Sequence, residues 1–312
     1  MTKTYFISFG NGLFQNQLKR ITKEAIDTGW FDEVISETPE TIKDFIDSHK
    51  ELFAHPRGLG FWVWKPYIIK RQLEKMNEGD FLFYTDAGSK ILSHREERFN
   101  QYKNYFLQQQ PVWGSGTTHI LKQFVKMSLL KRLGIDKNEM ILNAFMVEGG
   151  FVGICKNEES MSFVNEWLNL CLEDNYKYVN DNLLEEQLPD FLDHRHDQSI
   201  FDCLLKIKGY QWFDEDCYGV GPFFHSRMSD EGPRKYAPDW FRSKPGYERG
   251  KHMWLKDFLA DQTDPLWWKG QKEYDPKTMF SEDDFCTYMY NTYSNGTRFD
   301  DDHPSQLNKK NK

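Results

Sequence analysis

One carboxylate, Asp86, directly follows an apolar run in the segment Phe81-Leu82-Phe83-Tyr84-Thr85-Asp86-Ala87-Gly88. Carboxylate oxygens bind divalent cations, and Gly88 lets the backbone come close to a ligand. A continuous apolar run is typical of a strand covered on both faces, and open α/β sheets bind ligands at the carboxyl ends of such strands. Asp86 is therefore a candidate ligand-binding residue. The alternative is a surface turn in which the Asp makes only local hydrogen bonds.

A second polar cluster, His194-Arg195-His196-Asp197-Gln198-Ser199, precedes a segment with apolar residues at helical spacing that ends at Gly209. A helix N-terminus offers unpaired N–H groups and attracts anions, so this cluster is a candidate ligand site. Two histidines near one carboxylate could bind a metal, although their spacing matches no established zinc motif. The alternative for Asp197 is simple capping of the helix.

Glu148-Gly149-Gly150 interrupts the mostly apolar segment 140–155, which we expect to form two strands with a tight backbone approach between them. A carboxylate within so apolar a run needs a partner, because an unpaired buried charge is costly. Glu148 is either a ligand contact or the acid of a turn.

The elements that would position these groups follow an α/β pattern. The sequence predicts a strand at 5–9, a helix that ends at Gly29 and a strand at 31–35, and this β-α-β order favours a parallel sheet. Backbone N–H groups of the Ser8–Gly12 loop could face a nucleotide, but the loop lacks the GxGxxG pattern and a plain βα loop is the alternative. Further helices are predicted at 41–54, 66–79, 121–134, 157–171 and 197–209.

Composition limits the class of protein. The chain has 312 residues, a net charge of −8 and a pI of about 5.7, so no overall basic field attracts nucleic acid. Its five cysteines form no CxxC pair, which favours reduced core residues. Because residues 1–6 lead at once into a predicted strand, we expect them to be neither a signal peptide nor a transit peptide, and no run approaches the roughly 18 apolar residues that would span a bilayer. We expect a cytoplasmic protein, with peripheral association with a membrane left open.

Three motifs, taken in order, resemble those of bacterial and viral GT-A glycosyltransferases. They are Gly60-Phe61-Trp62-Val63-Trp64-Lys65-Pro66-Tyr67, Tyr84 to Gly88, and His194 to Ser199. The resemblance covers about residues 4 to 228 and implies a Rossmann-like α/β domain of the GT-A type, with a mostly parallel central sheet flanked by helices. We expect this domain over 1–232 and an irregular C-terminal extension over 233–312, disordered after about 303.

The resemblance implies roles for single residues. Asp86 corresponds to a DxD-type metal motif whose second Asp is absent here, and His225 is the implied late ligand for Mn²⁺ or Mg²⁺. Asp197, Gln198 and Glu148 are the implied catalytic residues. The implied nucleotide- and donor-binding residues are Ser8, Phe9, Gly10, Asn11, Trp64, Lys65, Thr85, Asp86, Ala87, Gly88, Gly149, Gly150 and His196.

The implied function is transfer of a sugar from a nucleotide-diphosphate sugar donor to a glycan or other hydroxyl acceptor, as in polysaccharide biosynthesis. The transfer is expected to be metal-assisted, and the Asp197-Gln198 pair favours retention of configuration. An inverting reaction would instead need Glu148 or Asp197 as base. Two alternatives stay open: a metal-dependent sugar-nucleotide hydrolase, and a carbohydrate- or nucleotide-binding module without catalysis.

Overall fold

The structure is a computed structural model that describes residues 2–210, 221–224, 228–229 and 232–233. The chain divides into two compact units, Met1–Asp230 and Glu231–Lys312. The first unit contains the elements described below, and the short strand β11 (Gly232–Pro233) belongs to the second. The predicted extension 233–312 and the predicted fraying after residue 303 lie outside the described residues, apart from Pro233.

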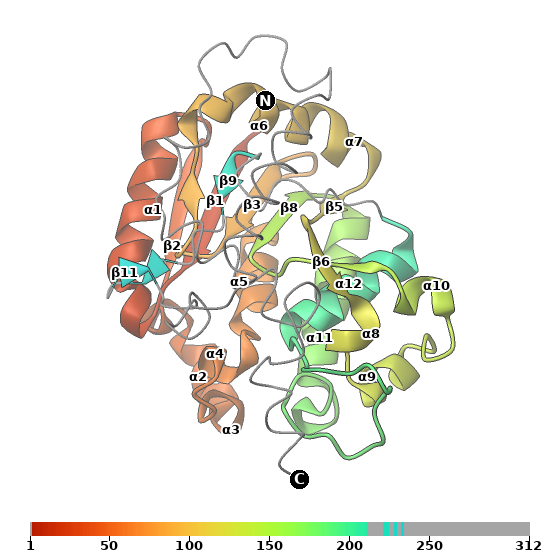
Figure 1. The fold of residues 1–312 in the computed structure, drawn as a ribbon. Helices are drawn as coiled ribbons and strands as arrows, with labels where there is room; N and C mark the ends of the chain where they lie inside the picture. Colours follow the sequence, from red (N-terminus) through yellow and green to blue (C-terminus); the bar gives the residue numbers. More distant parts are fainter. Residues whose placement is uncertain (1, 211–220, 225–227, 230–231, 234–312) are drawn as a thin grey trace, which may run out of the picture. The chain divides into compact units, whose positions relative to one another are not determined.

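A five-stranded sheet forms the centre of the first unit (Figure 1). Its strands, in spatial order, are β2 (Glu33–Glu37), β1 (Thr4–Phe9), β3 (Phe81–Thr85), β8 (Phe151–Cys155) and β5 (Val112–Trp113). Strand β1 pairs in parallel with β2 and β3, whereas β8 runs antiparallel to β3 and β5. The prediction of an α/β protein with a mostly parallel central sheet is confirmed.

Smaller strand pairs lie outside the sheet. Strand β4 (Lys90–Ile91) pairs with β9 (Phe223–Phe224), and β6 (Gly116–Ile120) pairs with β7 (Phe145–Val147). A further short strand is β10 (Met228–Ser229). The β6–β7 pair leads directly into the Glu148-Gly149-Gly150 turn, and β8 follows that turn.

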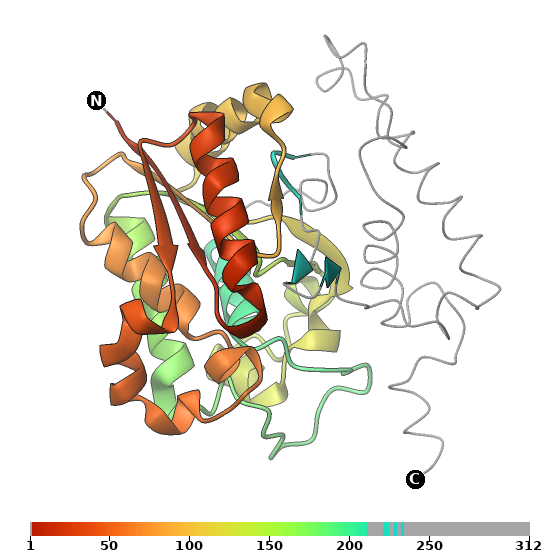
Figure 2. The ribbon, with the colours of Figure 1, turned by 90° about the vertical axis from the view of Figure 1, so that its left-hand side faces the viewer.

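Apolar side chains alternate across the sheet and form a core on each face. Phe6 and Phe83 point to one face, where α1 (Gln15–Thr28) packs through Ile21 and Ala25. Figure 2 shows α1 lying along the sheet. This helix ends as predicted because Gly29 adopts the left-handed conformation (φ 68°) that glycine tolerates.

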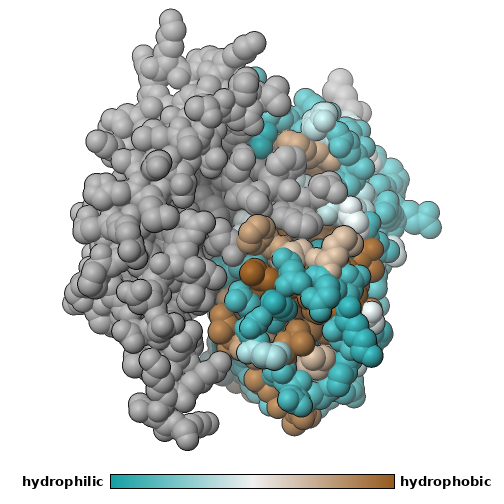
Figure 3. All heavy atoms as spheres, turned by 45° about the vertical axis from the view of Figure 1, so that its right-hand side comes forward, coloured by the Kyte–Doolittle hydropathy of each residue, from teal (hydrophilic) through white to brown (hydrophobic). Residues whose placement is uncertain are grey.

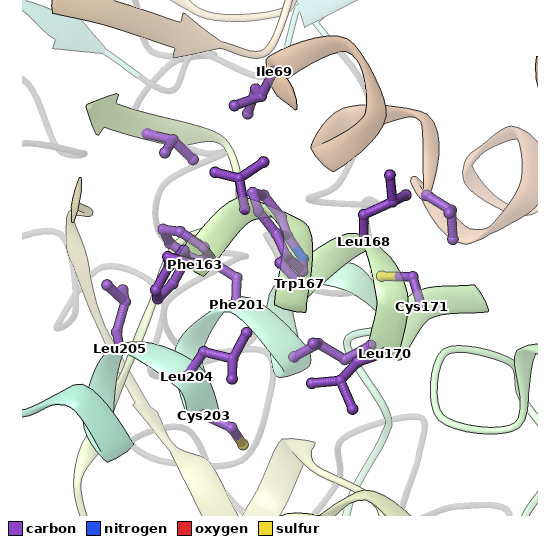
Figure 4. Packing of buried hydrophobic residues seen from close by; sticks show 14 of the residues in the cluster. Ile69, Phe163, Trp167, Leu168, Leu170, Cys171, Phe201, Cys203, Leu204 and Leu205 are labelled. Atoms are coloured by element: carbon purple, nitrogen blue, oxygen red, sulfur yellow. The ribbon is translucent and has the colours of Figure 1, made fainter. Parts of the chain in front are cut away.

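Three helices cover the opposite face of the sheet: α5 (Trp64–Leu73), α11 (Glu158–Tyr176) and α12 (Asp197–Lys208). Figure 4 shows side chains of α11 and α12 pointing toward one another, with Ile69 of α5 nearby. The rings of Trp167 and Phe201 lie 4.7 Å apart at this contact. Burying large aromatic side chains here stabilises the fold and fixes α12 against α11.

The remaining helices among the described residues are short. They are η1 (Gly12–Phe14), η2 (Pro39–Ile42), α2 (Lys43–Ser48), α3 (Lys50–Phe53), α4 (Gly58–Phe61), η3 (Ser93–Arg95), α6 (Glu96–Gln101), η4 (Tyr102–Phe106), α7 (Leu107–Gln109), α8 (Leu121–Phe124), α9 (Met127–Arg132) and α10 (Glu139–Leu142). The single helix predicted over 121–134 is wrong, since Val125 and Lys126 are extended between α8 and α9. The buried Lys126 explains the break, because its backbone N–H faces Nδ1 of His194 at 3.4 Å and its ammonium binds Asn180.

The described part of the surface in Figure 3 is mostly hydrophilic, with apolar side chains exposed in patches. Cys171 and Cys203 are buried free thiols and Cys155 is partly buried, as predicted for reduced core residues, whereas Cys217 and Cys286 lie outside the described residues. Among the described residues, no helix is long and apolar enough to cross a membrane.

Candidate functional site

The turn before β8 meets the carboxyl end of β3. Thr85 pairs with Phe151 in the antiparallel register, and the N–H of Asp86 donates to the carbonyl of Gly150 at 3.0 Å. The hydroxyl of Thr85 donates to the same carbonyl at 3.1 Å. Because β8 runs opposite to β3, the Gly149-Gly150 turn lies at the edge where Asp86 leaves the sheet.

Lys65 joins this edge to the N-terminus of α12. Its side chain is only 3% exposed, and its ammonium donates to the carbonyl of Gly149 at 2.7 Å. The same nitrogen lies 2.9 Å from Oδ2 of Asp197 and 4.0 Å from Oδ1 of Asp86. One buried cation therefore brings together three segments that the sequence had singled out separately.

A compact turn before α5 sets the position of Lys65. Phe61 and Trp62 adopt left-handed φ angles of 56° and 61°, which are rare for large side chains and store strain. Gly58 is required here, because a Cβ at this position would meet the Trp62 ring at 2.2 Å. Trp64 stacks on Phe9 of β1 at 4.0 Å and donates from Nε1 to the Gly58 carbonyl, so the start of α5 is fixed to the sheet.

The N-terminus of α12 differs from the predicted cap. His196, with φ 55° and ψ −122°, is the N-cap residue, and Asp197 is the first residue of the helix. The alternative in which Asp197 only caps the helix is therefore wrong, since its carboxylate faces Lys65 instead. His196 is held by a 2.7 Å hydrogen bond from Nδ1 to the Val179 carbonyl and by stacking on Phe61 at 4.9 Å.

Gln198 lies close against the Gly149-Gly150 turn. Its Nε2 donates to the carbonyl of Val147 at 2.9 Å, which leaves Oε1 as the acceptor end of the amide. A Cβ added to Gly149 would lie 2.9 Å from Cβ of Gln198 and 3.4 Å from Nζ of Lys65. Glycine at position 149 is therefore needed for this close approach.

Burial and neighbouring charges shift the pKa values in the site. Burial raises the pKa of Asp197 to about 6, although the ammonium of Lys65 opposes the shift. For Lys65, burial works against the charged form, but Asp197 and Asp86 outweigh it and the pKa is raised. Burial and the charge of Asp86 raise the pKa of Tyr84, whose hydroxyl donates to Oδ1 of Asp86 at 2.5 Å. Near neutral pH a protonated Lys65 therefore faces an ionised Asp197, and Asp86 lies 4.0 Å from the same ammonium.

A pocket of about 100 Å³ opens at these three side chains. Its walls are Arg57, Trp62, Lys65, Asp86, Glu148, Gly149, Gly150, Arg195, His196, Asp197 and Gln198. Arg57, Trp62 and Arg195 were not among the residues predicted from sequence, although Trp62 and Arg195 fall inside two of the motifs. Arg57 pairs with Asp181 and Asp193, both at 2.8 Å, so much of its charge is balanced within the protein.

The remaining predicted residues that the structure describes do not line this pocket, and most of them are buried. The Ser8 hydroxyl is fully buried and donates to the Thr85 carbonyl at 2.7 Å, which ties β1 to β3. Gly10 packs so closely that a Cβ would meet Leu18 at 2.7 Å. Phe9, Ala87 and Gly88 are also buried, whereas Asn11 is partly exposed. His225 lies outside the described residues.

The described residues do not by themselves fit a resident divalent cation. Among them, no group of three or more His, Cys, Asp or Glu side chains could hold a metal ion. Asp86 already accepts from Tyr84 and faces the Lys65 ammonium, and Asp197 is paired with the same ammonium. Mg²⁺ and related hard cations prefer about six oxygen ligands, which this set does not supply.

Comparisons with known proteins give distant resemblances in structure only. No family model matches the chain, and no curated protein matches it in sequence. The apo structure of mouse xyloside xylosyltransferase 1 is 12% identical, covering 69% of this chain and 85% of that one, with a TM-score of 0.38. A glycosyltransferase involved in glycosylation of the major capsid of PBCV-1 is 9% identical, covering 62% and 81%, with a TM-score of 0.31. Likeness this weak implies neither a shared activity nor a shared substrate.

Proposed function

We propose that the protein is a glycosyltransferase that moves a sugar from a nucleotide-diphosphate sugar to a hydroxyl group of a glycan or other acceptor. One observation carries the proposal: the three motifs that resemble GT-A glycosyltransferases meet at one pocket. Lys65, Asp86 and Asp197, one from each motif, form a single ionic cluster at the carboxyl edge of the sheet. Ligands of open α/β sheets bind at this edge.

The groups around the pocket suit a sugar. Asp86, Glu148 and Asp197 supply carboxylate oxygens, and Gln198 directs its Oε1 away from the Val147 carbonyl that its Nε2 binds. All four accept hydrogen bonds, and sugar hydroxyls donate them. Trp62 adds an aromatic wall against which the apolar face of a sugar ring can stack. We assign these residues to the transferred sugar and the attacking acceptor.

The reaction breaks the bond between C1 of the sugar and the diphosphate oxygen, and the acceptor oxygen forms a new bond to C1. Charge grows on the leaving diphosphate while the sugar becomes oxocarbenium-like. We propose that Lys65, whose raised pKa keeps it protonated, stabilises that charge from its place at the pocket wall. The loop from Ser8 to Asn11 would hold the nucleotide at the neighbouring strand end.

The proton of the acceptor hydroxyl has two possible destinations. In a retaining reaction, which the Asp197-Gln198 pair favours, the leaving phosphate oxygen takes it. In an inverting reaction a carboxylate takes it, and Glu148 and Asp197 both line the pocket. The anomeric configuration of an isolated product decides between them.

We propose that a Mn²⁺ or Mg²⁺ ion, where one takes part, enters together with the donor. Asp86 would be its protein ligand, with His225 as the implied second ligand, and the diphosphate would supply further oxygens. No step above depends on the ion, because the described residues do not hold one alone.

Thermal unfolding tests the binding half of the proposal. Each of UDP, GDP and CDP is tested with and without Mn²⁺. At least one of them should raise the melting temperature, since a ligand that binds only the folded state stabilises it. Asp86→Ala should weaken the shift. Asp27→Ala removes an exposed carboxylate on α1 and should leave it unchanged. The absence of a shift with every nucleotide contradicts the proposal.

Turnover separates the transferase from its alternatives. Sugar nucleotides incubated with a glycan acceptor should release nucleoside diphosphate, and release should depend on the acceptor. Release without an acceptor favours a hydrolase. Binding without any release favours a carbohydrate- or nucleotide-binding module.

A further inference from the structure

Both backbone polar groups of Val147 are bound by side chains of one helix. Gln198 of α12 donates from Nε2 to the Val147 carbonyl at 2.9 Å. The Val147 N–H donates to Oδ1 of Asp202 at 3.1 Å. Positions 198 and 202 are four residues apart and so lie on the same face of α12. The two side chains hold the Val147 peptide groups from one side, as a clamp.

An aspartate at position 202 is unfavourable for stability, because its carboxyl group is removed from water. It is completely buried and forms an ion pair with Lys206, one turn further along α12. Its second oxygen, Oδ2, has no hydrogen-bond partner among the described residues. A buried ion pair of this kind is often no more stable than apolar side chains of similar size. The ion pair with Lys206 therefore does not explain why residue 202 is an acid. The hydrogen bond that Asp202 accepts from the Val147 N–H gives a specific explanation.

Val147 immediately precedes the turn that lines the pocket. The Gly149 carbonyl accepts from Lys65 at 2.7 Å, and the Gly150 carbonyl accepts from the Asp86 N–H at 3.0 Å. The turn is thus held at its C-terminal end, Gly149-Gly150, by Lys65 and Asp86, and at its N-terminal end, next to Val147, by α12. Asp202 itself does not line the pocket, whereas Glu148, Gly149 and Gly150 do.

We propose that Asp202 is a positioning residue that, together with Gln198, clamps Val147 and so fixes the Glu148-Gly149-Gly150 turn in the pocket wall. The clamp is independent of what the pocket binds, and its consequence for a nucleotide-diphosphate ligand rests on the proposed function. Asp202 acts through Val147 and touches no ligand.

Two double variants test the clamp in the full-length chain. Asp202→Asn with Lys206→Met keeps a carbonyl acceptor for the Val147 N–H, whereas Asp202→Leu with Lys206→Met removes it. Both lack the buried charges, so neither leaves an unpaired ion. Amide hydrogen exchange is measured by mass spectrometry on peptides that cover residues 145–152.

The leucine variant should exchange roughly tenfold faster than the asparagine variant at Val147 to Gly150, as expected for loss of one hydrogen bond. Peptides from β1 should exchange equally in both. Equal exchange of the turn in the two variants overturns the proposal. Should the leucine variant not fold, replacing Val147 by its α-hydroxy acid puts an ester oxygen in place of the N–H and keeps every side chain. That substitution should speed exchange at Glu148 to Gly150, and unchanged exchange there also overturns the proposal.

Nucleotide binding gives a second measurement. Whichever of UDP, GDP and CDP stabilises the wild-type chain should raise the melting temperature less in the leucine variant than in the asparagine variant, and an equal rise in both contradicts a role of Asp202 in the site. If no nucleotide stabilises the wild-type chain, the proposed function fails, and the exchange comparison still decides the clamp.

Discussion

The ammonium nitrogen of Lys65 lies 2.9 Å from Oδ2 of Asp197, and each side chain is only 3% exposed. Two opposite charges are thus removed from water together, at a point where β3, α5 and α12 come together. Desolvating such a pair costs several kcal/mol per ion, and only mutual attraction and further hydrogen bonds offset it. The pair therefore couples the stability of this region to its state of protonation.

Lys65→Met should destabilise the protein in a pH-dependent way. Without the ammonium, the buried Asp197 has a still higher pKa than its present value of about 6. The folded state then keeps a proton over a pH range in which the unfolded carboxyl group is ionised, so the free energy of unfolding falls as the pH rises. Near pH 8 we expect a loss of about 3–5 kcal/mol, measured by urea unfolding. The double variant Lys65→Met, Asp197→Leu should be less destabilised, and a pH-independent loss in the single variant contradicts the argument.

The proposed sugar transfer should be lost in acid with a midpoint near pH 6. Asp197 accepts hydrogen bonds with both oxygens only when ionised, and burial raises its pKa to about 6. Activity is therefore present above this pH and falls as the pH decreases through it. Initial rates from pH 4.5 to 8 measure the profile. Asp197→Asn should be nearly inactive at every pH. Full activity of this variant contradicts a role of Asp197 in the reaction.

Gly149→Ala should damage the site directly. The new methyl group would lie 2.9 Å from Cβ of Gln198, closer than packed carbon atoms approach. We expect a loss of about 1–3 kcal/mol in the free energy of unfolding and a strong loss of activity. Gly153→Ala is the matched control in β8, because its Cβ would meet Phe83 at an ordinary 3.4 Å. Similar losses in both variants would point to a general effect of alanine in this sheet.

Tyr84→Phe should disturb Asp86 without moving the sheet. The Tyr84 ring is buried, and its hydroxyl donates to Oδ1 of Asp86 at 2.5 Å. Loss of a hydrogen bond to a charged group costs about 1.5–3 kcal/mol. We expect weaker stabilisation by nucleotides in thermal unfolding. Tyr67→Phe, at a partly buried tyrosine stacked on Phe45, is the control and should bind as the wild type does.

Local signals made much of the fold predictable from sequence. The glycines at 29 and 209 adopt left-handed angles that end α1 and α12. Asn157 caps α11 through a hydrogen bond from the Ser160 N–H to its side chain, as its position before two glutamates indicated. Each of these signals depends on residues within one helical turn, so the sequence alone contains it.

Features that depend on distant partners were not predictable in this way. The break between α8 and α9 follows from contacts of Lys126 with His194 and Asn180, far along the chain. The resemblance implied that Lys65 binds the nucleotide or donor, and nothing in its local sequence indicated that its ammonium is also held by Asp197 and the Gly149 carbonyl. The apolar pattern of 151–155 predicted a strand, but nothing in it indicated that β8 runs antiparallel to its neighbours.

The antiparallel course of β8 also bears on how the protein folds. Its turn bonds to Lys65 across 84 residues, and the Val147 clamp spans 51 and 55 residues. Contacts between such distant segments form late, because the entropy of closing long loops is lost before the contacts offset it. We therefore expect the pocket to be among the last features to form during folding. A chain that ended before α12 would lack Asp197 and Gln198 from the pocket wall and both side chains of the Val147 clamp, so ligand binding reports that the chain has folded through to this helix.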